Sequence, residues 1–403
     1  MNKFIVLFCG IAVIGTADSE TLTLQRALEL AQIHSPELRA VQLHAQAAEK
    51  GVEASGLWKN PILKIEAEGV GWDNDLFSEG EYSLGLMQEF QLGGKRRKAR
   101  NAALKSIDVA GFVLAERQLG LADAVRKAFI EVVYLQESGK VQAEQEELGR
   151  AFVEVAKRRH EAGAGSELES VQAELELEKI LFAQTCCLGE LIAAQERLAS
   201  LIGVSLLDLP ELTALYFELK TIEDLLLGDT HPTLRRLDAE ADKIRAEAQS
   251  AKAQDVANVS LGAGYKYEAA GDINTFVFSA SMPLSFSKRG RAEYAEGLLR
   301  TDAVLTEREE ARRMLQAELS AARALYRGAK MQAELSQKNL IPKAEQAYEL
   351  SRAGYEAGRF SWLELIASQQ HLAELRIGYI EALKEAHLAR IEILKLNPKG
   401  NEL

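Results

Sequence analysis

A ten-residue segment that occurs twice sets the strongest limit on how this chain can fold. HEAGAGSELE at 160–169 shares Glu-Ala-Gly, Ser and Leu-Glu, in the same positions, with YEAGRFSWLE at 355–364. The flanks of both copies follow one order: a helix, two short alternating segments, a very long helix, the decapeptide and a return helix. A repeat of this length is too long for a solenoid and predicts a duplicated supersecondary unit.

This duplication divides the chain into five predicted parts. They are a leader at 1–17, a first repeat at 18–203, a connector at 204–230, a second repeat at 231–397 and a tail at 398–403. The leader has Lys3 followed by an apolar stretch at 4–14 and small residues at 15–17, which is typical of a secretory signal peptide. The mature chain is therefore expected to be exported.

Long helices are predicted at 95–161 and 290–356, each on the order of 100 Å at 1.5 Å per residue. Apolar residues recur at steps of four and three, as in the run Ile107, Ala110 and Leu114, which predicts antiparallel packing of long helices. Pro342 is expected to bend or interrupt the second helix locally.

Each decapeptide is predicted to be the tip of a helical hairpin. Glycine suits the end of a helix, and Ser followed three residues later by Glu forms a capping box at the start of the next helix. The turn glycines are Gly163, Gly165 and Gly358, and the predicted capping boxes are Ser166 with Glu169 and Ser361 with Glu364. A plainer interpretation is that these tips are connecting turns and nothing more.

Four segments alternate between apolar and other residues, which predicts strands at about 60–69, 81–92, 256–268 and 274–286. Their length suits tilted transmembrane strands, and aromatic residues such as Trp58, Trp72, Phe90 and Phe286 stand near their ends. The alternative is a pair of hairpins on a soluble core. Four strands cannot close a barrel, so a membrane location requires several chains to pool their strands.

Composition excludes several function classes. The net charge is −12, which argues against a nucleic-acid partner. The 3 cysteines and 6 histidines show no spacing suited to a disulfide framework or a metal site, and we find no nucleotide motif or catalytic triad. We therefore predict a protein that is not an enzyme and has no cofactor or resident metal.

The signal peptide, the duplicated order of elements and the tip pattern Tyr355, Gly358, Ser361, Leu363, Glu364 together resemble the TolC-like outer-membrane efflux factors. The stretch EFQLGGKRRKAR at 89–100 looks most like their CzcC-type heavy-metal efflux branch. This resemblance implies a mainly α fold with a small β part. Long helical hairpins would form a periplasmic α-barrel, and a homotrimer would assemble a 12-stranded outer-membrane β-barrel.

The resemblance also implies partners and roles. The partners would be a periplasmic adaptor (membrane fusion) protein, an inner-membrane pump of the resistance-nodulation-division type and outer-membrane lipid. The implied gate or latch residues are Tyr355, Arg359, Glu364, Glu169 and His160, and the implied adaptor-docking turns contain Gly163, Gly165, Ser166, Gly358 and Ser361. On the first strand, Glu66 and Glu68 would add lumen charge that favours cations.

The expected function is a passive exit duct for heavy-metal cations in the outer membrane, with a long periplasmic portion. Two alternatives remain at the level of sequence. The same channel would serve drug efflux or type I protein secretion, or the chain would be a soluble periplasmic coiled-coil adaptor or structural rod.

Overall fold

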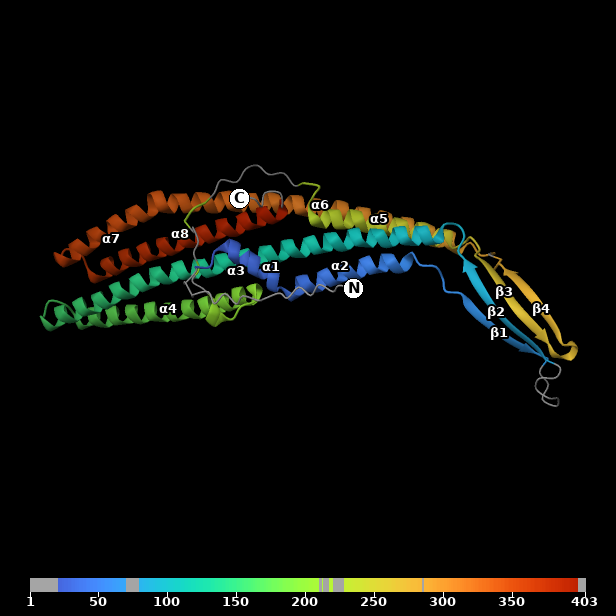
Figure 1. Cartoon of the computed structure of the whole chain (residues 1–403). Helices are drawn as coiled ribbons and strands as arrows, with labels where there is room; N and C mark the ends of the chain where they lie inside the picture. The colour runs from blue at the N-terminus through green and yellow to red at the C-terminus, as the bar shows by residue number, and fades with distance from the viewer. Residues whose placement is uncertain are drawn as a thin grey trace, which may run out of the picture. The chain divides into compact units, whose positions relative to one another are not determined.

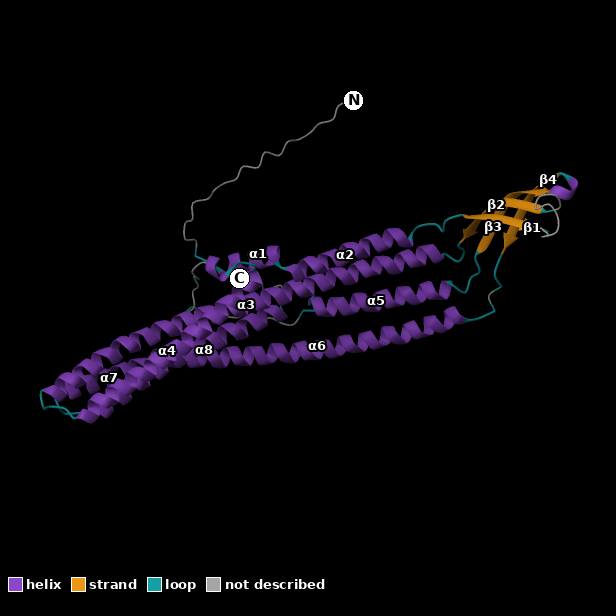
Figure 2. Cartoon of the chain, turned by 90° about the horizontal axis from the view of Figure 1, so that it is seen from below, coloured by secondary structure: helices purple, strands orange, loops and turns teal. Residues whose placement is uncertain are grey.

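The computed structural model describes residues 21–69, 80–209, 212, 217–219, 228–284 and 286–397. The predicted signal peptide, Trp72, part of the connector and the predicted tail lie outside these residues. Within them the chain is mainly helical with one four-stranded antiparallel sheet, which confirms the predicted fold class (Figures 1 and 2).

The elements follow the same order in both halves of the chain (Figure 1). The first half contains α1 (Leu24–His34), α2 (Pro36–Ser55), β1 (Ile62–Glu68), β2 (Glu81–Phe90), α3 (Lys95–Glu161), α4 (Glu167–Ile202) and η1 (Leu206–Asp208). The second half contains α5 (Pro232–Ala253), β3 (Val259–Glu268), η2 (Ala269–Gly271), β4 (Ile273–Ser281), α6 (Arg289–Leu335), η3 (Ser336–Leu340), α7 (Ile341–Glu356) and α8 (Trp362–Leu396).

The second long helix is interrupted, as predicted from Pro342. The interruption is η3, a π-helical segment directly before α7, and Pro342 is in the first turn of α7. Proline lacks an N–H group and its ring crowds the carbonyl four residues earlier. The wider π turn at 336–340 accommodates this conflict while the chain continues as a helix. In contrast, α3 runs without a break over 67 residues.

The chain forms two compact units. The first unit comprises residues 1–35, 121–223 and 321–393, and the second comprises 36–120, 224–320 and 394–403. In the first unit α4 returns beside α3, and α8 returns beside α7, so each pair is a helical hairpin (Figure 1). Its main core contains Phe129, Leu198, Ile202 and Leu383, all of which are buried.

The second unit contains the sheet, whose strands follow the order β1-β2-β3-β4. The pairing register places Ile65 beside Leu84, Leu84 beside Tyr265, and Tyr265 beside Phe276. Because side chains alternate along a strand, this register collects most of the apolar side chains of the four strands on one face. The other face carries the charged side chains together with a few apolar ones, such as Met87 and Val277.

All four strands are shorter than predicted at the end of the sheet that adjoins the helices: β1 begins at Ile62, β2 ends at Phe90, β3 begins at Val259 and β4 ends at Ser281. After β2 the chain turns at Gly93 and Gly94, which have φ of 68° and 70°, a conformation that extended strands do not adopt. After β4 comes Pro283, which has no N–H group to donate to a neighbouring strand.

Candidate functional site

The first hairpin tip joins α3 to α4 through a turn that only glycine adopts without strain. Gly163 has φ of 72°, and the N–H groups of Ala164 and Gly165 donate to the carbonyl of Arg159 at 2.8 and 3.0 Å. Ser166 then caps α4, because its hydroxyl accepts the N–H of Glu169 at 3.2 Å. The structure therefore contains the predicted helix end and N-cap at this tip.

The second tip joins α7 to α8 with the same geometry and a complete capping box. Gly358 has φ of 70°, and the hydroxyl of Ser361 accepts the N–H of Glu364 at 3.3 Å. The Glu364 carboxylate returns to accept the N–H of Ser361 at 2.7 Å and its hydroxyl at 2.9 Å. These bonds, first of all the one from the Ser361 N–H, hold the pKa of Glu364 below its ordinary value.

The two tips differ by an exchange of large and small residues. In the second tip Phe360 folds over Gly354, where an added Cβ would lie 2.1 Å from the Phe360 ring. The equivalent positions of the first tip hold Arg159 and Gly165, and there the Cβ added to Gly165 would lie 3.1 Å from that of Arg159. Each tip therefore has one bulky side chain and one glycine, in opposite places, because the turn has room for a single side chain.

Tyr355 is the residue through which the two hairpins interlock. It is buried, and the guanidinium carbon of Arg159, from the other hairpin, lies 4.7 Å from the centre of its ring. Trp362 meets the same ring edge-on at 5.6 Å and also contacts Phe152 of α3 at 5.5 Å. These contacts build a small aromatic core that joins the two hairpins.

The polar atoms around Tyr355 are only partly satisfied. The Tyr355 hydroxyl, Arg159 Nε and one carboxylate oxygen of Glu169 are buried and have no hydrogen-bond partner among the described residues. Burial raises the pKa of Tyr355, while the nearby Arg159 opposes this and Glu169 adds to it. Tyr355, Arg159 and Glu169 are therefore close together, at a place where a small shift of one side chain changes the contacts of the others.

The remaining predicted latch residues are on the surface. Arg359 and His160 are exposed, and within the described part of the chain no hydrogen bond or ion pair joins either of them to Tyr355. Sequence reasoning missed Arg159, the cation that does contact Tyr355. Its signal was faint, since Arg159 is one of three consecutive basic residues at 158–160.

Further polar contacts lie behind the tip, within the first hairpin and between the two hairpins. Lys157 of α3 pairs with Glu174 of α4 at 2.9 Å, which ties the first hairpin together. The Gln370 side chain of α8 donates to Glu176 of α4 at 2.6 Å, so this contact crosses between hairpins. The Lys157–Glu174 pair is about half exposed, so it contributes little alone, and the aromatic core supplies most of the cohesion.

The polar face of the sheet is the second candidate region. Glu66 and Glu68 lie on this face, where Glu66 accepts the Ser83 hydroxyl at 3.4 Å and also pairs with Lys64. Further along, Lys266 pairs with Glu81. The five glutamates of this face outnumber its two lysines; they are Glu66, Glu68, Glu81, Glu89 and Glu268, against Lys64 and Lys266.

Two glycines lie opposite each other in the middle of the polar face. Gly85 of β2 pairs with Gly264 of β3, and a Cβ on Gly264 would lie 2.9 Å from the Gly85 Cα. Strands with side chains here would be pushed apart, whereas glycines permit the close approach that curves a sheet. This face is therefore suited to be the concave one.

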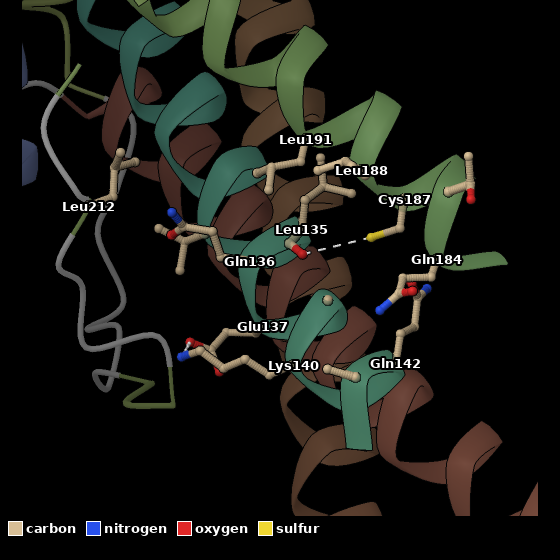
Figure 3. A pocket seen from close by; sticks show the side chains of 14 residues that line it. Leu135, Gln136, Glu137, Lys140, Gln142, Gln184, Cys187, Leu188, Leu191 and Leu212 are labelled. Carbon is tan, nitrogen blue, oxygen red and sulfur yellow. Dashed lines mark hydrogen bonds and ion pairs between the residues drawn. The ribbon is translucent and has the colours of Figure 1, made fainter. Parts of the chain in front are cut away.

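A cavity of about 800 Å³ lies between α3 and α4 in the first unit (Figure 3). Its lining combines apolar residues with Gln136, Gln142 and Gln184, and Cys187 donates a weak hydrogen bond to the carbonyl of Leu135 at 3.9 Å. Burial raises the pKa of the Cys187 thiol, which disfavours the reactive thiolate. This lining does not assemble a nucleophile with a base.

Among the residues that the structure describes, no group of three or more His, Cys, Asp or Glu side chains lies close enough together to hold a metal ion. None of the helices in the described ranges is both long and apolar enough to cross a membrane.

Comparison with known proteins decides the family. The model of a family described as outer membrane efflux protein matches residues 27–204 and 226–396. The chain belongs to the outer membrane efflux protein family. This confirms the resemblance drawn from the duplicated order of elements, and the two matched ranges run close to the two repeats.

Individual relatives agree with this family. The cobalt-zinc-cadmium resistance protein CzcC of Cupriavidus metallidurans is 24% identical over 377 residues, which cover 92% of this chain and 89% of CzcC. The fold is similar to that of CusC, with a TM-score of 0.80 at 16% identity over 96% of this chain and 95% of CusC. It is also similar to VceC of Vibrio cholerae, with a TM-score of 0.76 at 16% identity over 93% of this chain and 95% of VceC.

Proposed function

We propose that this efflux-family member is the outer-membrane exit channel of a tripartite pump and acts as a homotrimer. The observation that carries the proposal is the sheet, which has one apolar face, one polar face and two end strands, β1 and β4. A sheet with unpaired edges is not tolerated in lipid, whereas three copies would supply twelve strands for one closed barrel. The apolar face would then meet lipid and the polar face would line the lumen.

Exposed apolar stripes on the helices of the first unit support association of several copies. Leu168, Leu175 and Phe182 recur every seven residues along α4 and are exposed. On the part of α6 in the first unit, on η3 and on α7, exposed large apolar residues are Leu325, Met331, Leu335, Leu340 and Leu350. Contiguous apolar stripes on long helices mark protein interfaces, and a second copy of this chain would cover them in a ring.

The cargo we propose is heavy-metal cations. Support comes from the similarity to CzcC, whose name describes cobalt-zinc-cadmium resistance, and from the excess of glutamate on the polar face. Three-fold symmetry would turn Glu66 and Glu68 into rings of negative charge, which favour cations in a pore. Because the pump selects the cargo in such assemblies, drugs or a secreted polypeptide remain the competing cargoes for the same channel.

The tips would close the periplasmic entrance and dock the adaptor, which receives cargo from the inner-membrane pump. Support for a gate comes from the interlock of Tyr355 with Arg159, which holds the two hairpins together. Arg359, Glu364 and His160 are exposed at the tips, where a neighbouring copy or the adaptor would meet them. The docking turns would be those around Gly163, Gly165 and Ser166 and around Gly358 and Ser361.

The test is conductance of the purified protein in a planar bilayer, with ion selectivity recorded. We expect a small cation-selective conductance that rises in the double variant Tyr355→Phe/Arg359→Ser, with a larger rise in Arg159→Gln, since Arg159 is the cation that contacts Tyr355. Replacing Glu66 and Glu68 with Gln should lower the preference for cations over anions.

Two results would contradict the proposal. A protein that is extracted without detergent as a monomer and does not conduct would favour the soluble coiled-coil rod. A channel whose selectivity is the same with and without Glu66 and Glu68 would remove the electrostatic argument for cations. As a matched control, Glu147→Gln removes one carboxylate from α3 and should change neither conductance nor selectivity.

A further inference from the structure

At one end of the sheet the strands continue into four helices, α2, α3, α5 and α6. We call this region the junction; it comprises residues 56–61, 90–100, 254–258, 282–284 and 286–291. The register brings its parts together, since Phe90 pairs with Val259 and Ser260 pairs with Ser281. A Cβ on Gly93 would lie 2.8 Å from the Val256 side chain, and the Gly290 N–H donates to Asp255 at 2.8 Å. The starts of α3 and α6 therefore both contact the short segment 254–258.

The junction is basic, although the chain as a whole has a net charge of −12. Five of the six residues at 95–100 are Lys or Arg, and so are three of the four residues at 288–291. Neither helix has an acidic residue in its first turn. The amino end of a helix carries partial positive charge, so this placement of cations is unfavourable unless an external anion compensates.

Only part of this positive charge is neutralised within the junction. Lys59 holds Glu89 with two bonds of 2.8 and 2.9 Å, and the buried Lys95 donates to Asn258 at 2.6 Å. Arg289 pairs with Glu293 at 2.7 Å. In the described part of the chain no carboxylate pairs with the remaining cations, which are Arg96, Arg97, Lys98, Arg100, Lys288 and Arg291.

Aromatic side chains place one of these cations on the apolar side of the sheet. Phe90 belongs to the apolar face by its register and meets Trp58 edge-on at 6.0 Å. The guanidinium carbon of Arg96 lies 4.2 Å from the centre of the Trp58 ring. Trp58 is 58% exposed and Phe286 is 87% exposed, so large apolar side chains stand in solvent beside unpaired cations.

We propose that the junction binds the phosphate groups of anionic phospholipids, through Arg96, Arg97 and Arg100 on α3 and Lys288 and Arg291 on α6. This inference rests on the proposed membrane location of the sheet. Aromatic rings and long basic side chains together are typical of the bilayer interface, where the rings lie among headgroups and the cations meet phosphate. The guanidinium group also matches phosphate oxygens with two parallel hydrogen bonds.

The occupant is a lipid phosphate rather than free phosphate because the exposed apolar residues adjoin the cations. A soluble phosphate ion would satisfy the arginines but would leave Trp58, Leu284 and Phe286 in water. A phospholipid satisfies both, since its acyl chains cover the apolar side chains while its headgroup carries the negative charge. The excess of cations over carboxylates selects anionic lipids over zwitterionic ones.

The experiment measures which lipids the protein retains. The full chain is reconstituted into nanodiscs of equal parts phosphatidylglycerol and phosphatidylcholine, extracted in mild detergent, and its bound lipids are counted by mass spectrometry. The wild type should be enriched in phosphatidylglycerol. The triple variant Arg96→Gln/Arg97→Gln/Arg100→Gln should lower that enrichment about fivefold or more, since each basic residue near an anionic surface contributes a factor of about five.

The matched control removes three exposed arginines elsewhere, in Arg39→Gln/Arg197→Gln/Arg313→Gln, and should keep the wild-type enrichment. Equal enrichment in the junction variant and the wild type would overturn the proposal. So would complete displacement of phosphatidylglycerol by inorganic phosphate, which would identify a free-phosphate site. If the junction variant does not assemble, the enrichment of the wild type is measured at low and at high NaCl. Equal enrichment at both concentrations overturns the proposal, because salt screens contacts between exposed cations and lipid phosphate.

Separate measurements test the lipid site and the proposed channel. Wild-type conductance in pure phosphatidylcholine tests the channel alone. A conducting wild type without phosphatidylglycerol enrichment overturns the lipid site only. Enrichment in the wild type, with no conductance from either the wild type or the Arg159→Gln variant, overturns the channel only.

Discussion

The contact between Arg159 and Tyr355 makes a quantitative prediction about what holds the two tips together. The perturbations are Arg159→Gln, Tyr355→Leu and the two combined. Arg159→Gln removes the cation from the Tyr355 ring, 4.7 Å away, and the hydrogen bond to the Ala164 carbonyl at 3.1 Å. Tyr355→Leu keeps an apolar side chain in the buried site but removes the ring that meets both Arg159 and Trp362.

The magnitude follows from the partial burial of the pair. Arg159 is half-buried and Tyr355 is buried, so the cation–π contact should contribute about 1 kcal/mol, between its exposed and desolvated values. Arg159→Gln also loses the hydrogen bond to the Ala164 carbonyl, and Tyr355→Leu also loses the edge-on contact with Trp362; each of these losses costs about 1 kcal/mol more. We therefore expect each single variant to cost about 2 kcal/mol and the double variant about 3 kcal/mol, because the shared contact is lost only once.

The assay is amide hydrogen exchange at the tips, followed by mass spectrometry of peptides that cover the two turns. The reporting amides are those of Ala164 and Arg359, which donate to helix-end carbonyls at 2.8 Å in the two tips. A cost of about 1.4 kcal/mol corresponds to about tenfold faster local opening. The coupling energy of about 1 kcal/mol therefore means that exchange in the double variant should be about fivefold slower than the two single effects would give together.

The matched control is Arg158→Gln, which removes the same charge from the neighbouring position. Arg158 is exposed and donates to the Glu154 carbonyl at 3.2 Å, with no contact to the Tyr355 ring. Its effect should add to that of Tyr355→Leu without coupling. If the costs of Arg159→Gln and Tyr355→Leu also add, within about 0.3 kcal/mol, the contact between Arg159 and Tyr355 does not stabilise the tips, which contradicts the prediction.

Three further predictions concern the turns and one helix start. Gly354→Ala should destabilise the second tip by about 1–2 kcal/mol through overlap with Phe360, and Phe360→Ala should restore most of that loss in the same exchange assay; no restoration would contradict the overlap. The neutral ring of His231 caps α5, and burial holds the pKa of His231 below its ordinary value of 6.5. The free energy of unfolding should therefore fall as the pH drops from about 6.5 through the lower pKa of the folded state. His231→Asn keeps a cap but should flatten that slope in thermal melts, and an unchanged slope would assign it to other groups. Ser361→Ala should cost about 1 kcal/mol and more than Ser166→Ala, because the Ser361 hydroxyl accepts the Glu364 N–H and also donates to the Glu364 carboxylate, whereas the Ser166 hydroxyl only accepts the Glu169 N–H; equal costs would show that the hydroxyl bond to the Glu364 carboxylate contributes nothing.

Part of the site was open to prediction because it is encoded locally. The capping residues Ser166 and Ser361 were found from their distance to the following glutamates, and Gly163 and Gly358 from their place between helix and cap. Such features involve residues three or four apart, so the chain that carries them specifies them without help from the rest of the fold.

The partners of Tyr355 were not open to prediction in the same way. Arg159 is 196 residues away in sequence, and nothing in the tip pattern favours it over its basic neighbours Arg158 and His160. The expected partner, Arg359, is close in sequence but is exposed in the turn. Which of several cations reaches a ring depends on how two hairpins rotate against each other, and that rotation is set by the packing of the whole aromatic core.

By itself the sequence determined the duplication, the helix and strand periods, the tip turns and the break before Pro342. These depend on steric and hydrogen-bonding preferences of neighbouring residues. Only the tertiary structure decided the strand register that opposes Gly85 to Gly264, the exchange of glycine with a bulky residue between the tips, and the meeting of two basic helix starts at one edge of the sheet. Each of these joins segments far apart in the chain, whose relative placement comes from packing that short-range patterns leave open.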